Sequence, residues 1–131
     1  MKRFRTPATA LGVGLALTLA ACGGGGGEEA SGGDGGAAIT DGVFALMGTD
    51  QLTWDVTEAT ADAGELTIEL TCGDTVNHNV VIEGVDGDAV IAECNPGETA
   101  TGTVTLEAGT YTYYCDVPGH RSTMTGTLTV S

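Results

Sequence analysis

Basic residues are scarce in this 131-residue chain, which has four Lys and Arg against eighteen Asp and Glu and a formal net charge of −14. Three of the four bases lie within the first five residues, and the fourth is Arg121. So little positive charge excludes nucleic acid and anionic lipid headgroups as binding partners. The acidity would attract a basic protein partner, although solubility or adaptation to a saline habitat explains it equally well.

The chain also lacks an apolar run of the roughly 20 residues that a membrane-spanning helix needs. Its longest apolar stretch, residues 8–21, contains Thr and Gly and follows the basic residues Lys2, Arg3 and Arg5. This order is typical of a secretory signal, which we expect to span residues 1–21 and to be removed. The mature protein is therefore expected outside the cytoplasm.

The predicted signal ends in Leu-Ala-Ala-Cys, which resembles the lipobox of prokaryotic lipoproteins. In such proteins the signal is cut before the cysteine, whose thiol receives a diacylglyceryl group, so Cys22 is a candidate for lipidation. A diacyl chain plus an acylated amino group would anchor the protein stably to the cell membrane. A plain signal peptide with a chance cysteine at its end is the alternative. After cleavage Arg121 alone would face the eighteen acids, a formal charge of −17.

Large apolar side chains are absent from residues 23–38, which are mostly Gly with a few acids. Such a segment cannot bury enough surface to order itself, so residues 22–38 are predicted to be a lipidated cysteine followed by a flexible tether. Random-coil scaling gives this tether a mean reach of about 20–25 Å. Residues 39–131 contain no second linker and are predicted to form one domain.

The domain shows no helical periodicity; its apolar residues alternate with polar ones, as at Leu66, Ile68 and Leu70. A period of two predicts antiparallel strands with one buried face. Strands are expected at residues 42–47, 66–71, 78–83, 89–93, 103–107, 110–115 and 125–130. Residues 57–64 could hold a short turn. Seven to eight short strands separated by Gly, Asp, Asn or Pro predict an all-β fold, a Greek-key β-sandwich.

Histidine is also scarce, and the chain contains only His78 and His120. His120 lies between Cys115 and Met124, so that a thiol, an imidazole and a thioether fall in one predicted loop between two strands. One tight loop could present all three to a metal ion, and His78 could join them from a neighbouring strand. Two imidazoles, a thiolate and a weak thioether are the donor set of mononuclear copper sites that exchange single electrons.

The spacing Cys-x4-His-x3-Met resembles that of the cupredoxins, the blue (type 1) copper proteins, in particular their azurin-like and plastocyanin-like members. Residues 76–82 are similar to the strand that carries the family's first ligand, and residues 109–115 to the strand that leads into its site. The resemblance implies one copper ion that cycles between Cu(I) and Cu(II). It also implies that His78, Cys115 and His120 are the equatorial ligands and that Met124 is the long axial one.

The resemblance further implies roles for the residues that flank these ligands. Asn79 matches the position whose side chain braces the ligand loop, and the carbonyl group of Asn77 would lie near the metal opposite the methionine. The ring edge of His120 would reach the surface within an apolar patch, where electrons leave. Arg121 departs from the small neutral residue that the family pattern leads us to expect beside that ligand.

Cys72 and Cys94 remain, and two further thiols in an exported domain most simply form a disulfide. The alternative makes them additional metal ligands. The familiar binuclear copper site, however, places both of its thiolates in one Cys-x3-Cys loop, and the loop here contains a single cysteine.

The two histidines also limit the possible functions. Copper enzymes such as nitrite reductases and multicopper oxidases need a second metal centre with several more histidines, and no Ser or Cys has a spare histidine for a hydrolytic triad. The expected function is therefore electron transfer without enzymatic activity, by a membrane-tethered monomer. Its partners would be extracytoplasmic redox proteins, such as a cytochrome or a copper oxidoreductase. A copper carrier or storage lipoprotein and a metal-free adhesive sandwich are the alternatives.

Overall fold

The computed structural model describes residues 36–131, so the predicted signal, Cys22 and nearly all of the predicted tether lie outside the described residues. Nine strands make up the described part. They are β1 (Ala37–Ile39), β2 (Val43–Gly48), β3 (Glu58–Ala61), β4 (Gly64–Cys72), β5 (His78–Ile82), β6 (Val90–Cys94), β7 (Thr99–Leu106), β8 (Gly109–Tyr114) and β9 (Thr125–Val130). No helix capable of crossing a bilayer occurs among residues 36–131.

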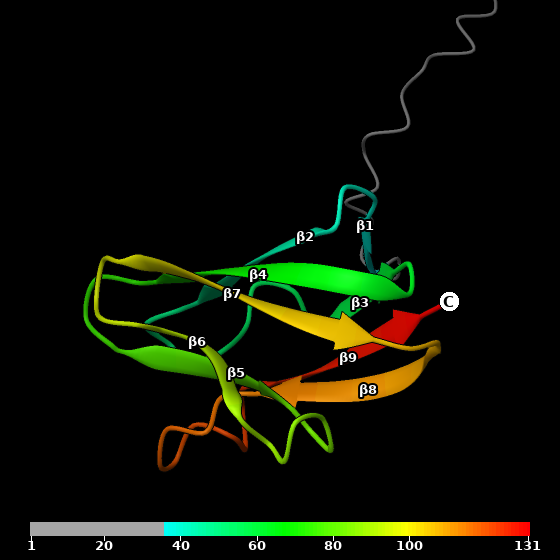
Figure 1. Ribbon diagram of the computed structural model, residues 1–131. Coiled ribbons are helices and arrows are strands. Elements are labelled where there is room, and N and C mark those ends of the chain that lie inside the picture. The colour runs from blue at the N-terminus through cyan, green and yellow to red at the C-terminus, as the bar shows by residue number, and fades with distance from the viewer. Residues whose placement is uncertain (1–35) are drawn as a thin grey trace, which may run out of the picture. The chain divides into compact units, whose positions relative to one another are not determined.

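The strands form two sheets that face each other (Figure 1). One has six strands in the order β1-β3-β9-β8-β5-β6, and the other has three in the order β2-β4-β7. Apolar side chains from both sheets fill the space between them, among them Phe44, Ile68 and Leu128, which are at most 1% exposed. The predicted all-β sandwich is confirmed.

Two strands, β1 and β3, were not expected from the sequence. β3 occupies part of the segment predicted to hold a turn, and β1 begins at Ala37, within the segment predicted as tether. Both are short and consist largely of small residues, so neither carries a strong local strand pattern. They obtain their hydrogen bonds from distant segments, because β1 pairs with β3 and β3 pairs with β9 at the end of the chain.

The prediction that the strands are all antiparallel was wrong. β2 runs parallel to β4, and the pairs β1–β3 and β3–β9 are also parallel. The reason is that side chains alternate between two faces in either kind of sheet, so a period of two does not reveal the direction of the neighbouring strand.

β5 also differs from the expected half-buried strand, because all five of its residues are buried. It lies inside the six-stranded sheet between β8 and β6, with Val80 and Ile82 in the core. On its outer side it contacts the segment that follows β8, since the side chain of Asn79 accepts a hydrogen bond from the backbone N–H of Asp116 at 2.6 Å.

The predicted disulfide between Cys72 and Cys94 is confirmed, with Cα atoms 5.8 Å apart. It joins the end of β4 in one sheet to the end of β6 in the other. Cys115 is the remaining cysteine of the described residues, and it is free and buried.

Replacing both Cys72 and Cys94 with Ala should lower the free energy of unfolding by about 3 kcal/mol, because the bond closes a chain segment of 22 residues and restricts the unfolded state. Urea unfolding of the metal-free protein measures the change. The unmodified protein under reducing conditions is the control and should unfold near the midpoint of the double variant. Equal midpoints for the double variant and the oxidised wild type would contradict the expectation.

Candidate metal centre

Three of the predicted ligands meet at one end of the sandwich. His78 is the first residue of β5, Cys115 directly follows β8, and His120 lies in the turn region between β8 and β9. The structure brings one donor atom of each to within 4.8 Å of the others, and Cys115 Sγ lies 3.6 Å from His120 Nδ1. All three residues are buried, so the donors form a compact site for one metal ion.

A backbone carbonyl fixes the orientation of His78. Its Nε2 lies 3.1 Å from the carbonyl oxygen of Thr49. Because that oxygen can only accept a hydrogen bond, Nε2 carries the hydrogen and Nδ1 of the neutral ring has a free lone pair. Nδ1 is buried and makes no hydrogen bond, whereas buried polar atoms in folded proteins nearly always have a partner. An unpartnered nitrogen beside a thiol and a second imidazole fits a metal ligand.

Gly48 makes room for this histidine. It ends β2 and forms an isolated bridge with Trp54, whose ring also lies beside His78 at a centroid distance of 6.2 Å. A Cβ atom at position 48 would stand 2.4 Å from Cδ2 of His78, which is closer than real contacts allow. Gly48 and Thr49 were missed at the sequence level, because nothing in a glycine at the end of a strand and the threonine that follows it points to a histidine 29 residues beyond Thr49.

Burial sets the protonation of the metal-free site. It lowers the pKa of His78, and the charge of His120 adds to this effect, so His78 is neutral and its lone pair is available at neutral pH. Burial raises the pKa of the Cys115 thiol, although the backbone N–H of Asn79, 3.5 Å from Sγ, opposes this rise. A bound cation would therefore supply the positive charge that makes the thiolate favourable there.

Backbone hydrogen bonds close the loop that carries Cys115, His120 and Met124. The N–H of Cys115 donates to the carbonyl of Met124 at 3.1 Å, and the N–H of Met124 donates to the carbonyl of His120 at 2.9 Å. The bond from Asp116 to the side chain of Asn79 then ties the start of the loop to β5. The ligand loop is thus held at both ends before any metal binds.

The remaining predicted site residues differ in their surroundings. Met124 is wholly buried and belongs to the core cluster that also contains Cys115. Asn77 is exposed and immediately precedes β5, and the position of its carbonyl group opposite a methionine stays a prediction. His120 is 8% exposed, whereas His78 is fully buried, so His120 is the imidazole nearer to solvent.

Comparison with known proteins agrees with this geometry. A family model described as copper binding proteins of the plastocyanin/azurin family matches residues 43–131. The fold is similar to that of auracyanin A, a "blue" copper protein from the green thermophilic photosynthetic bacterium Chloroflexus aurantiacus. That match has a TM-score of 0.60 and 28% identity, and covers 72% of this chain and 100% of auracyanin A.

A second similar structure is the azurin Az-iso2 from the obligate methylotroph Methylomonas sp. strain J. Its TM-score is 0.57 with 20% identity, and the match covers 70% of this chain and 99% of that chain. At this level of identity the likeness shows the fold alone. No curated protein sequence matches the chain significantly.

Gly48→Ala should weaken copper binding by about 10- to 100-fold, because the added methyl group displaces the His78 ring from its bond to Thr49. Competition with a chelator of known copper affinity measures the loss. Gly109→Ala is the matched control, since its Cβ would meet Tyr111 no closer than 3.6 Å, an ordinary contact. Wild-type affinity in Gly48→Ala would show that the ring has more freedom than the structure indicates.

Proposed function

Since the chain belongs to the plastocyanin/azurin family of copper-binding proteins, we propose that it is a one-electron carrier whose cofactor is a single copper ion held by His78, Cys115 and His120. Copper in such a site supplies the reversible change between Cu(I) and Cu(II). The observation that carries the proposal is the buried cluster of three donors, in which His78 Nδ1 has no hydrogen-bond partner.

The protein's contribution to electron transfer would be rigidity. His78 and Cys115 stand at the ends of adjacent strands. The carbonyl of Thr49 accepts a hydrogen bond from the first ring, and the side chain of Asn79 accepts one from the start of the ligand loop. Donors fixed in this way move little when the charge of the ion changes, so little reorganisation opposes the transfer. The burial of the three donors favours cycling of a retained ion over its delivery to another protein.

A carrier fits the donor set better than an enzyme does. Among residues 36–131 the cluster of His78, Cys115 and His120 is the single group of His, Cys, Asp and Glu suited to a metal ion. It uses both histidines of the chain, so no imidazole remains for a second copper centre.

Met124 would complete the site as a weak axial donor. Its support is its position in the ligand loop, its complete burial and its backbone hydrogen bonds to Cys115 and His120. A thioether is a soft donor that favours Cu(I), and its distance from the metal is one means by which such sites tune their reduction potential.

We further propose that the protein works outside the cytoplasm, anchored to the cell membrane through Cys22. The support is the sequence of residues 1–38 alone, with its basic start, apolar stretch, lipobox-like end and Gly-rich continuation. The acidic surface would attract basic redox partners, and electrons would leave through His120, the more exposed imidazole.

Adding Cu(II) to the metal-free protein should produce an intense blue colour and a reversible one-electron reduction. The colour requires charge transfer from a thiolate, so Cys115→Ser should abolish it while the fold is retained. Absorption spectra and voltammetry measure these effects, with circular dichroism as the check on folding. A colourless complex of the wild type would favour a copper carrier, and a blue serine variant would refute the assignment of Cys115.

Met124→Leu should retain copper but raise the reduction potential, because loss of a weak donor disfavours Cu(II). Voltammetry of the two proteins under identical conditions measures the difference. Met47→Leu is the control, because Met47 is 42% exposed on β2 and offers the same chemical change away from the site. Equal potentials for the Met124 variant and the wild type would mean that this methionine only fills the core.

The anchor is testable in cells that express the full chain. A labelled fatty acid should be incorporated into the wild type and not into Cys22→Ser, and the variant should leave the membrane fraction. Labelling of the serine variant, or no labelling of either protein, would refute lipidation at this cysteine.

A further inference from the structure

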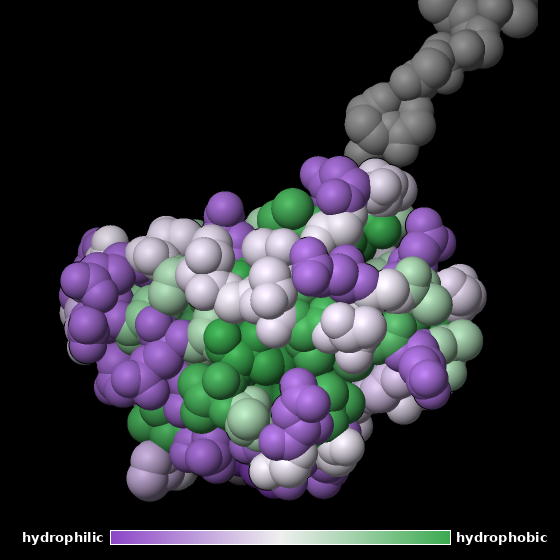
Figure 2. Space-filling model, viewed as in Figure 1, coloured by the Kyte–Doolittle hydropathy of each residue, from purple (hydrophilic) through white to green (hydrophobic). Residues whose placement is uncertain are grey.

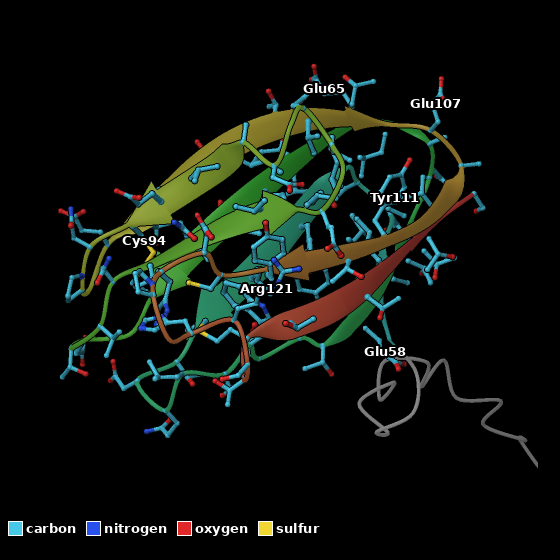
Figure 3. The ribbon with its side chains drawn as sticks, turned by 90° about the horizontal axis from the view of Figure 1, so that it is seen from below. Glu58, Glu65, Cys94, Glu107, Tyr111 and Arg121 are labelled. Atoms are coloured by element: carbon cyan, nitrogen blue, oxygen red, sulfur yellow. A yellow bond between two sulfur atoms is a disulfide. The ribbon has the colours of Figure 1, made fainter. Side chains whose placement is uncertain are left out.

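Arg121 makes two side-chain contacts that the donor set does not require. Its guanidinium carbon lies 3.8 Å from the centroid of the Tyr114 ring, and its Nη2 donates a hydrogen bond to Oε1 of Glu83 at 2.9 Å. Figure 3 shows Arg121 beside the end of β8 that leads into the ligand loop. It is the only Lys or Arg among residues 36–131, and it directly follows His120.

The main chain of Arg121 is held at the same pair of strands, β8 and β9, that its side chain contacts. Its carbonyl oxygen accepts a hydrogen bond from Oγ1 of Thr125 at 2.7 Å. Thr125 is the partner of Tyr114 across β8 and β9, so both ends of Arg121 are attached to one cross-strand pair. Tyr114 immediately precedes Cys115, and Glu83 immediately follows β5. Arg121 therefore links the three segments that carry His78, Cys115 and His120.

Stacking on Tyr114 contributes more to this link than the ion pair does. The side chains of Arg121 and Glu83 are 53% and 52% exposed, and exposed ion pairs contribute little to stability. Tyr114 is only 3% exposed yet lies outside the main core cluster, so the stacked guanidinium shields its ring. A cation over a desolvated aromatic ring is the stronger of the two interactions.

We propose that Arg121 is a positioning residue that holds the His120 segment of the ligand loop on Tyr114, and that Glu83 neutralises its charge beside the metal site. The second half of this proposal rests on the proposed function, because it requires a centre whose charge changes. An unneutralised cation near the site would favour the reduced ion, and an unneutralised anion would favour the oxidised ion.

The stacking is testable without copper. In the metal-free protein the side-chain protons of Arg121 should show an upfield ring-current shift in nuclear magnetic resonance spectra, and Tyr114→Leu should remove it. Arg121→Met should accelerate amide hydrogen exchange in residues 116–124, and Arg121→Lys should do so as well, because a lysine does not stack as a planar group. Unshifted Arg121 protons, or unchanged exchange in both variants, would overturn the positioning role.

The electrostatic role requires the copper-loaded full chain. At low salt Arg121→Met should lower the reduction potential, Glu83→Gln should raise it, and the double variant should return close to the wild type. Glu107→Gln removes the same charge at the other end of β8 (Figure 3) and should shift the potential least. All shifts should shrink at high salt. Arg121→Met should also release copper roughly three- to ten-fold faster.

The outcomes separate this inference from the proposed function. Failure of the wild type to form a reversible blue centre would overturn the proposed function and the electrostatic role, while the copper-free spectra would still decide the positioning role. A normal blue centre with both single variants shifted in the same direction, or with neither shifted, would overturn the electrostatic role alone. Opposite shifts that cancel in the double variant would support it, since loop disorder does not produce that cancellation.

Discussion

The hydrogen bond from Nε2 of His78 to the carbonyl of Thr49 is the interaction on which the metal centre depends. This bond decides which nitrogen carries the hydrogen. It leaves Nδ1 without a hydrogen, so that its lone pair is free to bind a metal ion beside Cys115 and His120. A different tautomer would point an N–H group into the site. Because the acceptor is the carbonyl of Thr49, which directly follows β2, the orientation of the ring is controlled from the other sheet of the sandwich.

The metal-free site lowers the stability of the fold, and the same features favour binding of a metal ion. An unpartnered buried nitrogen such as Nδ1 of His78 lowers stability by about 1–3 kcal/mol, and the buried thiol of Cys115 resists deprotonation. A bound cation removes both penalties, because it accepts the lone pair and stabilises the thiolate. The disulfide between Cys72 and Cys94 and the close-packed core supply the rigidity that keeps the donors together without it.

The surface of the domain is dominated by negative charge, and its basic residue lies beside this site. Acids greatly outnumber bases among residues 36–131, where Arg121 is the single Lys or Arg, and on the face shown in Figure 2 hydrophilic side chains lie around a central apolar area. Arg121 stands next to His120, where it is stacked on Tyr114 and paired with Glu83. The one basic residue of residues 36–131 therefore lies against the ligand loop, and in our proposal Glu83 limits its effect on the metal.

The sequence by itself determined the features that depend on near neighbours. Alternating side chains and turn residues predicted the seven strands that the structure contains as β2 and β4–β9, because the strand pattern lies in consecutive residues. The spacing of Cys115, His120 and Met124 predicted the ligand loop, and the structure brings Cys115 and His120 together with His78, whereas the role of Met124 stays a prediction. The pairing of Cys72 with Cys94 followed from the number of cysteines. Even the departure at Arg121 was visible, although its partners were not.

Only the tertiary structure decided the contacts that join distant segments. These are the parallel pairing of β3 with β9, the support of His78 by a carbonyl 29 residues earlier, and the pairing of Arg121 with a carboxylate 38 residues earlier. No local sequence pattern indicates the role of a backbone carbonyl, of a glycine that makes room for a ring, or of a short strand of small residues. Their function arises from contacts between segments that are distant in the chain, within one sheet as well as between the two sheets, and no stretch of neighbouring residues encodes such contacts.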